Sequence, residues 1–302
     1  MPISDKGSTA RDSELCRTSG LHGSGRSCVF LPRDSFVSVK QGIVLFSLYD
    51  SQSTRGVKAK FEQYRQKIEL TDGQRDRIIG THTHLRTKLL QPLSYVNKTQ
   101  LVGSYKKKTM IRPPSDVDVF VVVNEDRDRI TPNAVLNRLK RELSNAYPNT
   151  TIRQDKPCLV LDFKFCKFEL TPAIEDGGWW GGGYYIPQQG GNSWQNVDDP
   201  KELEESLAVA NRDQNGLLVP LIKMMKACKR HNGFKNIRSF EMEQKAIDEL
   251  RTINHYRGGI QDLLEIYDWN FRGMSHWSIS QMSDTEFLKL CRTHIFGPEF
   301  PV

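Results

Sequence analysis

Residues 103–123 read GSYKKKTMIRPPSDVDVFVVV, and this stretch decides the fold that the sequence predicts. From Val117 to Val123 it is a run of β-branched and aromatic residues, which indicates a buried strand. Residues two apart on a strand project to the same face, so Asp116 and Asp118 bring two carboxylates together where the strand begins. Two such carboxylates repel each other unless a cation is present, and Mg²⁺ prefers oxygen ligands of this kind together with substrate phosphates. The start of the strand is therefore a candidate metal site.

A turn suited to phosphate binding precedes the two carboxylates. Gly103 lets backbone N–H groups approach a phosphate closely, and the Ser104 hydroxyl adds a further donor. Positive charge beside that phosphate is expected from the residues in between: Lys106, Lys107, Lys108 and Arg112. Gly-Ser and Asp-x-Asp are each common by chance when they stand alone. Their order and separation, with a strand after the second Asp, favour a site for a nucleotide and a metal ion.

Helices and strands are predicted on both sides of this stretch. Helical spacing covers 57–70 and 71–90, with Thr71 as the N-cap of the second run and Gln74 three residues later. A short strand is predicted at 100–104, one long strand or a hairpin at 158–170, and a long loop at 176–200. Further helices are predicted at 132–147, 202–210, 216–230, 239–250, 260–266 and 284–294. The middle third is thus expected to be a sheet with flanking helices.

The composition argues against a membrane protein and favours anionic partners. Hydrophobic residues make up 37% and charged residues 26% of the chain, and no apolar run approaches the roughly 20 residues of a membrane span. The formal charge of +7 fits nucleotides and equally fits RNA. The six cysteines show neither CxxC pairs nor Cys/His spacing, so reduced thiols in the cytoplasm are expected rather than a zinc site or disulfides. No secretory signal is expected in residues 1–50, which are predicted to be a poorly ordered extension.

The residues quoted above resemble a known family. A Gly-Ser turn followed after about ten residues by Asp-x-Asp and an apolar strand is similar to the polymerase-β-like nucleotidyltransferases. Within that superfamily, the sequence around Gly103, Ile111 and Ser115 resembles the cGAS/DncV-like nucleotidyltransferases, the CD-NTases of bacterial antiphage signalling. The resemblance covers about residues 57–295. It implies an α+β fold, with a bilobal nucleotidyltransferase core at 51–200 built on a mixed sheet with flanking helices, and a C-terminal helical lobe at 201–302 that completes the nucleotide pocket.

The resemblance also implies further site residues. The family needs a third carboxylate on a later strand, and Phe168–Ala173 resembles its acid-x-x-Pro-Ala element, which favours Glu169. Asp162 is the alternative, because it lies on the same strand or hairpin and Asp is the commoner residue at the family's position. The segment 221–226 looks like the family's helix with a phosphate-binding lysine, and Lys226 matches that lysine best. The segment 239–243 matches a later helical element that is assigned to packing and pocket support.

The implied activity is that of a cyclic di- or trinucleotide synthase. In that activity two Mg²⁺ ions, or Mn²⁺, are held by Asp116, Asp118 and Glu169, while Gly103, Ser104 and Lys226 bind the nucleotide. ATP is the expected substrate, with GTP or others as options, and pyrophosphate is released. The resemblance also implies a cytoplasmic monomer, an effector protein that receives the product, and accessory regulators. Two other readings are a nucleotidyltransferase that acts on RNA, a small molecule or a protein, and a catalytically silent RNA-binding relative.

Overall fold

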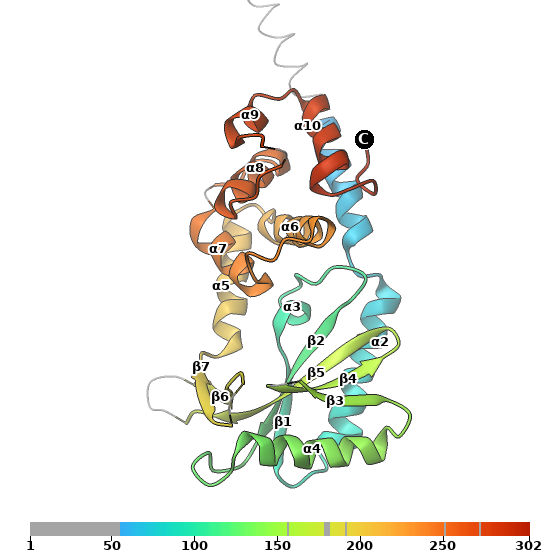
Figure 1. Cartoon of the computed structure of the whole chain (residues 1–302), viewed down its shortest axis with the longest axis vertical. Helices are drawn as coiled ribbons and strands as arrows, with labels where there is room; N and C mark the ends of the chain where they lie inside the picture. Colours follow the sequence, from blue (N-terminus) through green and yellow to red (C-terminus); the bar gives the residue numbers. More distant parts are fainter. Residues whose placement is uncertain (1–54, 156, 178–181, 191, 251, 272) are drawn as a thin grey trace, which may run out of the picture. The chain divides into compact units, whose positions relative to one another are not determined.

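The computed structural model describes residues 55–302 except 156, 178–181, 191, 251 and 272. These residues belong to one compact unit, Asp50–Val302, and Figure 1 shows its elements. The prediction of a poorly ordered extension at 1–50 lies outside the described residues. The division into a core at 51–200 and a helical lobe at 201–302 stays a prediction.

A mixed sheet forms one part of the unit, in the strand order β1-β2-β5-β4-β3. Its strands are β1 (Val96–Leu101), β2 (Asp116–Val123), β3 (Thr151–Asp155), β4 (Cys158–Phe163) and β5 (Cys166–Glu175). Strands β2 and β5 run parallel, whereas the other neighbours in this order are antiparallel. The segment 158–170 is therefore a hairpin, β4–β5, of which the second strand continues to Glu175. Two short antiparallel strands, β6 (Tyr184–Pro187) and β7 (Trp194–Val197), follow β5.

Strand β2 has one core face and one face that carries the candidate site. The side chains of Val117, Val119, Val121 and Val123 belong to the hydrophobic core beneath the sheet. That core is closed by α2 (Asp72–His84), its continuation η2 (Leu85–Leu90) and α4 (Pro132–Ala146). Because side chains alternate along a strand, Asp116 and Asp118 project from the opposite face. The apolar run that predicts the strand thus also fixes the direction of the two carboxylates.

The second part of the unit is helical and has its own core. Its elements are α5 (Pro200–Asp213), α6 (Leu218–Asn232), α7 (Ser239–Glu249), α8 (Tyr256–Ile266), α9 (His276–Ser280), α10 (Asp284–Leu290) and η3 (Cys291–Ile295). The helix at residues 55–68 packs into this core, where Phe61 contacts the rings of Phe287 and Phe300. Helix α6 lies at the centre, with nine residues buried, among them Lys223 and Lys226. The α+β fold with a mixed sheet and flanking helices is confirmed.

Several local predictions are confirmed and three need correction. Thr71 caps α2 through a reciprocal pair of hydrogen bonds with Gln74, as its spacing predicts. The predicted loop at 176–200 is wrong in part, because it contains β6 and β7, which pair with each other as a short antiparallel hairpin. The strand predicted at 100–104 instead begins at Val96, and the Gly103-Ser104 turn is the start of the short helix α3 (Gly103–Lys106).

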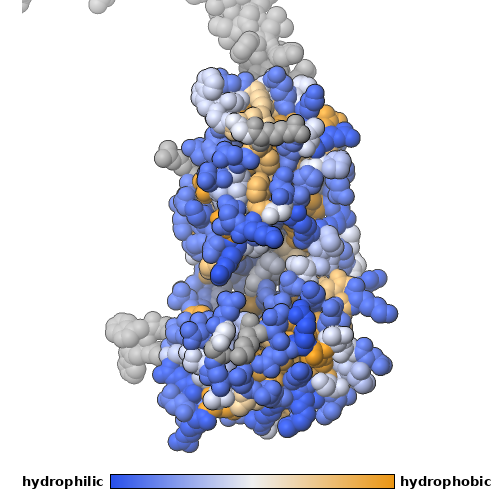
Figure 2. Space-filling view, in the orientation of Figure 1, coloured by the Kyte–Doolittle hydropathy of each residue, from blue (hydrophilic) through white to orange (hydrophobic). Residues whose placement is uncertain are grey.

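The described part of the chain has the surface and thiol chemistry that the composition predicts. None of its helices is long and apolar enough to cross a membrane, and the face in Figure 2 is mainly hydrophilic. Cys158, Cys166, Cys228 and Cys291 are buried and free.

Candidate active site

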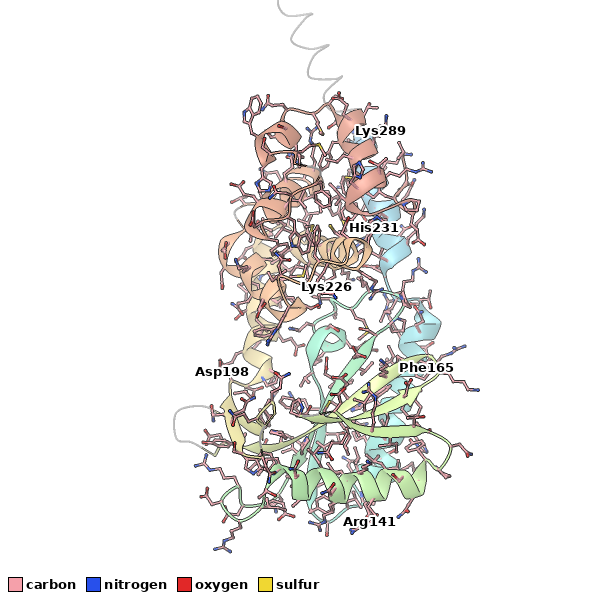
Figure 3. The ribbon with its side chains drawn as sticks, viewed as in Figure 1. Arg141, Phe165, Asp198, Lys226, His231 and Lys289 are labelled. Carbon is pink, nitrogen blue, oxygen red and sulfur yellow. The ribbon has the colours of Figure 1, made fainter. Side chains whose placement is uncertain are left out.

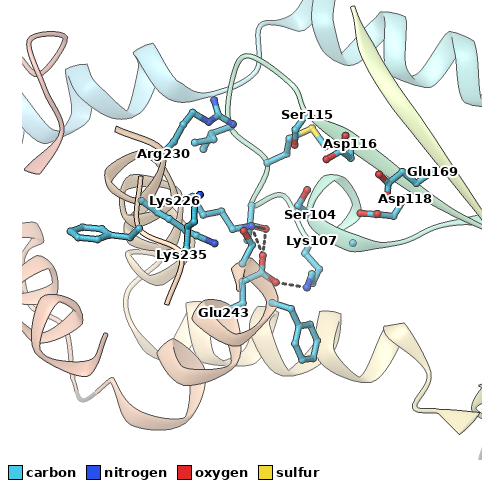
Figure 4. Close-up of a pocket in the computed structure, with 18 of the residues that line it drawn as sticks. Ser104, Lys107, Ser115, Asp116, Asp118, Glu169, Lys226, Arg230, Lys235 and Glu243 are labelled. Atoms are coloured by element: carbon cyan, nitrogen blue, oxygen red, sulfur yellow. Dashed lines mark hydrogen bonds and ion pairs between the residues drawn. The ribbon is translucent and has the colours of Figure 1, made fainter. Parts of the chain in front are cut away.

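A pocket of about 550 Å³ opens beside the N-terminal end of β2, where α3, β5, α6 and α7 also contribute residues. The carboxylates of Asp116, Asp118 and Glu169 lie on its strand side, as Figure 4 shows. Basic residues contribute the opposite charge: Lys107, Lys226, Lys229, Arg230 and Lys235. The rings of Phe234 and Phe240 supply apolar surface. This lining would suit a ligand that has several negative charges and an apolar part and that binds together with a cation.

The parallel pairing of β2 and β5 brings the three carboxylates to one face of the sheet. Asp118 stands opposite Glu169 in the register, and Asp116 lies two residues before Asp118 on the same face. Burial raises the pKa of Asp118 to about 7, and the carboxylates of Glu169 and Asp116 act in the same direction. Burial and the Asp116 carboxylate likewise raise the pKa of Glu169. The ionised forms of Asp118 and Glu169 are thus disfavoured, and a bound cation would relieve this repulsion.

The three carboxylates have the chemistry to bind a divalent cation, although their side chains are not arranged around one centre. Among the described residues, no group of three or more His, Cys, Asp or Glu side chains is arranged to hold a metal ion. The three carboxylates nevertheless present only hard oxygen donors on one pocket wall, which is what Mg²⁺ or Mn²⁺ selects. The register of their paired strands places them on one face of the sheet. The residues therefore fit a divalent-cation site.

Asp162 lies elsewhere in the hairpin. It stands opposite Lys167 in the β4–β5 register, so strand β5 separates it from β2. Its side chain is exposed, and it does not line the pocket. The structure brings Glu169 to Asp118, and leaves Asp162 outside this arrangement.

Gly103 and Ser104 line the pocket beside the carboxylates, and the backbone there requires glycine. Gly103 has a φ of 66°, in the left-handed region that L side chains avoid. A Cβ at this position would lie 1.9 Å from Oδ2 of Asp118, so the backbone approaches the carboxylate more closely than any other residue would permit. The backbone N–H of Val102 donates to the carbonyl of Asp118 at 3.0 Å. The Gly-Ser segment is thereby attached to the strand that carries the acids.

Lys226 reaches the pocket from α6, on the side of that helix nearer the strands (Figure 3). Its side chain is only 8% exposed. Its Nζ donates to Oγ1 of Thr109 at 2.9 Å and to Oε1 of Glu243 at 2.5 Å. Burial lowers the pKa of Lys226, and the Glu243 carboxylate opposes that shift. A lysine held in this way, in a pocket wall that is largely shielded from water, can present positive charge to a ligand.

The lysine run of residues 106–108 divides between two cavities, which corrects one expectation. Of these lysines only Lys107 lines the pocket with the carboxylates. Lys106 and Lys108 line a separate cavity on the other side of α3. Arg112 is also used elsewhere, because its guanidinium donates to the carbonyl oxygens of Lys67 and Gln66. Residues 106–108 lie at the end of a short helix and in the irregular segment after it, which has no repeating period. The sequence alone therefore could not predict which cavity each lysine side chain faces.

Sequence reasoning missed several lining residues on the helical side. Lys229, Arg230 and Lys235 belong to the end of α6 and the segment after it, where basic residues are usual on solvated surfaces. Phe234 and Phe240 flank them. Glu243, which the sequence assigns to pocket support, lies between Met242 and Ala246 on the buried face of α7. A carboxylate among apolar positions of one helix face is the signal that could have identified it.

Comparisons with known proteins agree with this fold. Residues 56–211 match the model of a Second Messenger Oligonucleotide or Dinucleotide Synthetase domain. Over 145 residues the chain is 30% identical to a cyclic AMP-AMP-AMP synthase of Acinetobacter sp., a match that covers 44% of this chain. The match spans only 40% of that relative's own length.

Two solved structures share the fold at low sequence identity. Escherichia coli MS115-1 CdnC with ATP superposes with a TM-score of 0.61 at 13% identity, and the match covers 81% of this chain and 99% of that one. Rhodothermus marinus CdnE c-UMP-AMP synthase with Apcpp and Upnpp gives a TM-score of 0.54 at 17% identity, with 71% and 83% covered. At such identities the likeness concerns the arrangement of the backbone.

Proposed function

The chain belongs to the Second Messenger Oligonucleotide or Dinucleotide Synthetase family, that of the CD-NTases, and on that premise we propose that it joins nucleoside triphosphates into a small cyclic oligonucleotide. The observation that carries the proposal is the one pocket in which Asp116, Asp118 and Glu169 lie across from a group of lysines, of which Lys226 is buried. Carboxylates alone would repel a triphosphate, and lysines alone would only bind one. Together they suit metal-dependent transfer of a nucleotidyl group.

The roles of the residues follow from their positions. Asp116, Asp118 and Glu169 would hold two Mg²⁺ ions, or Mn²⁺, at the strand side of the pocket. Bound there, such ions neutralise phosphoryl charge and lower the pKa of an attacking hydroxyl. Ser104 would donate its hydroxyl proton to a phosphate oxygen, while the Gly103 backbone permits close approach.

The leaving group is expected on the basic side. A ribose hydroxyl of one nucleotide attacks the α-phosphate of another, the bond to the β-phosphate breaks, and pyrophosphate leaves. Lys226 would bind the phosphates that become pyrophosphate, because it lies across the pocket from the acids (Figure 4). A second transfer of the same kind closes the ring to a di- or trinucleotide.

The biological setting belongs to the same proposal. ATP is the expected substrate, since the Acinetobacter relative is named for a product of AMP units, and GTP or another nucleotide could serve beside it. The product would act as a second messenger in antiphage defence by binding an effector protein, and accessory regulators could control the enzyme. We propose that the enzyme is a cytoplasmic monomer whose catalytic core at 51–200 is completed by the helical lobe at 201–302.

An activity assay tests the proposal. The purified full chain is incubated with Mg²⁺ and labelled ATP, GTP, CTP and UTP, singly and mixed, and products are digested with phosphatase. A cyclic product resists phosphatase and has the mass of the corresponding nucleoside monophosphates less one water for each linkage. Labelled RNA or protein would instead indicate a nucleotidyltransferase with another acceptor. Binding of RNA without any transfer would indicate a catalytically silent relative.

A further inference from the structure

The buried carboxylate of Glu243 holds two lysines that come from different elements. Glu243 lies on α7 and is 1% exposed. Its Oε1 accepts from Nζ of Lys226 at 2.5 Å, and its Oε2 forms an ion pair with Nζ of Lys107. Thr109 joins the cluster, since its hydroxyl donates to Oε1 of Glu243 at 2.5 Å. Figure 4 shows the group at the wall of the pocket that faces the three carboxylates.

Stability alone does not account for this arrangement. Taking two ammonium groups and a carboxylate out of water costs free energy that their attraction rarely exceeds, and apolar residues of similar size often serve a core as well. The cluster also has more positive than negative charge, because one carboxylate faces two lysines that are 8% and 9% exposed. Such a net positive charge, held beside an open pocket, is suited to an incoming anion.

The cluster also retains hydrogen-bonding capacity. An ammonium group has three donors, and Lys226 uses two of them on Thr109 and Glu243. Lys107 forms an ion pair with Oε2 of Glu243. The remaining donors on two adjacent ammonium groups match an anion with oxygens on neighbouring centres, such as a diphosphate.

Glu243 favours the charged form of Lys226, which such binding needs. Burial lowers the pKa of Lys226, and Lys107 adds to this effect, whereas Glu243 and the more distant Asp118 raise the pKa. Burial acts to raise the pKa of Glu243, but Lys226 and Lys107 hold it below its usual value. Without the Glu243 carboxylate, the two ammonium groups would repel each other in a pocket wall where burial already disfavours a charged group.

We propose that Glu243 is a positioning residue that holds Lys107 and Lys226 side by side as a clamp for the pyrophosphate part of the substrate. The inference rests on the proposed function and extends it, because it adds Lys107 as a second phosphate contact and explains what keeps both lysines in place. Glu243 itself does not touch the phosphates, since its carboxylate oxygens face the ammonium groups.

Binding of inorganic pyrophosphate to the full chain at saturating Mg²⁺, measured by titration calorimetry, tests the clamp. Glu243→Gln keeps the shape of the side chain and removes its charge, so we expect the dissociation constant to rise about tenfold or more. Lys107→Gln should give a rise of similar size. In the double variant the loss should be smaller than the product of the two single losses, because Glu243 acts through Lys107.

Glu204→Gln is the matched control. Glu204 pairs with Lys106, the neighbour of Lys107, at 3.3 Å, but this pair is partly exposed and lies outside the pocket. The control should bind pyrophosphate within about twofold of the unaltered chain. If Glu243 were merely structural, its variant would show a lower binding stoichiometry, from loss of folded protein, with an unchanged dissociation constant.

Three results would overturn the clamp: an unchanged dissociation constant in Glu243→Gln, tighter binding in that variant, or losses that multiply in full in the double variant. Tighter binding would mean that Glu243 competes with phosphate. Should Glu243→Gln fail to fold, Lys107→Gln still decides, since an unchanged dissociation constant there removes Lys107 from the clamp. The assay needs no synthesis, so a chain that makes no oligonucleotide can still confirm the clamp, and an active chain can still refute it.

Discussion

At the scale of single residues, the pocket wall formed by β2 and β5 carries carboxylates that repel one another. Asp118 is buried beside Glu169 and Asp116, and its pKa is raised to about 7 as a result. Near neutral pH its charge therefore opposes folding instead of supporting it, because a raised carboxyl pKa means that the folded state favours the protonated form. An arrangement that costs free energy in the free protein indicates a functional role for these acids.

The first prediction concerns the paired aspartates. Asp116→Ala combined with Asp118→Ala should abolish product, because no other carboxylates on β2 could hold a divalent cation. The thermal midpoint of the metal-free protein should not fall, since the change removes mutually repelling groups. Product formation and thermal unfolding are measured on one preparation. Turnover that survives in this variant would remove the two aspartates from the chemistry.

The second prediction ranks the two candidates for the third carboxylate. Glu169→Gln should lower kcat by about a hundredfold or more, because a metal ligand needs its charge. Asp162→Asn should change kcat by no more than about twofold, since Asp162 is exposed and lies outside the pocket. Steady-state kinetics at saturating Mg²⁺ compare the two variants. The opposite ranking would identify Asp162 as the third ligand.

The third prediction separates phosphate binding by Ser104 from a role in the local backbone. Ser104→Ala should lower kcat/KM some ten- to hundredfold, which corresponds to about 1.5–3 kcal/mol for a hydrogen bond to a charged group. Stability should barely change, because the hydrogen bonds that Ser104 accepts from Thr109 and Met110 use its backbone carbonyl. Kinetics and thermal unfolding are compared on the same protein. Lower stability with normal turnover would exclude Ser104 from phosphate binding.

At the scale of elements, local sequence patterns predict the helices and strands that neighbouring residues determine. They do not predict the contacts between segments that are far apart in the chain. The apolar run in β2 and the capping residues of α2 were sufficient to place both elements. The parallel pairing that brings Glu169 to Asp118 joins segments some fifty residues apart, and only the family resemblance indicated it. The strands β6 and β7 were missed because each has only four residues and lies beside glycines, which indicated a loop. The cluster around Glu243 was missed because three separate segments form it.

The fourth prediction tests a local pattern that the structure bears out. Thr71→Ala removes the side-chain acceptor of the capping box at the start of α2, so it should cost about 1 kcal/mol, or roughly 2–4 °C in Tm for a chain of this size. Thr83→Ala is the matched control, since Thr83 is an exposed residue inside the same helix, where alanine is favoured. It should leave Tm unchanged or slightly higher. Equal losses in both variants would mean that the cap contributes nothing of its own.

At the scale of the whole described unit, two hydrophobic cores are connected by the residues that line the pocket. The sheet core includes Met110, whereas its neighbour Ile111 belongs to the helical core. Thr109, immediately before them, is hydrogen-bonded to Glu243 of α7. A ligand between the acids and the lysines would contact both parts at once. We therefore expect nucleotide and metal together to raise Tm by mass action, as for any ligand that binds only the folded state.

The last prediction concerns residues 1–50. Deleting them should leave both activity and Tm nearly unchanged, because their apolar residues follow no period that would join a core. The buried core residues of the described part begin at Val57, after this segment. A deletion through residue 68 is the control, since it also removes Phe61 and Tyr64 from the helical core, and losing a buried aromatic side chain typically costs about 3–5 kcal/mol. The longer deletion should therefore fail to give a cooperative unfolding transition. A large loss of activity or Tm in the shorter one would mean that residues 1–50 pack against the enzyme and form part of it.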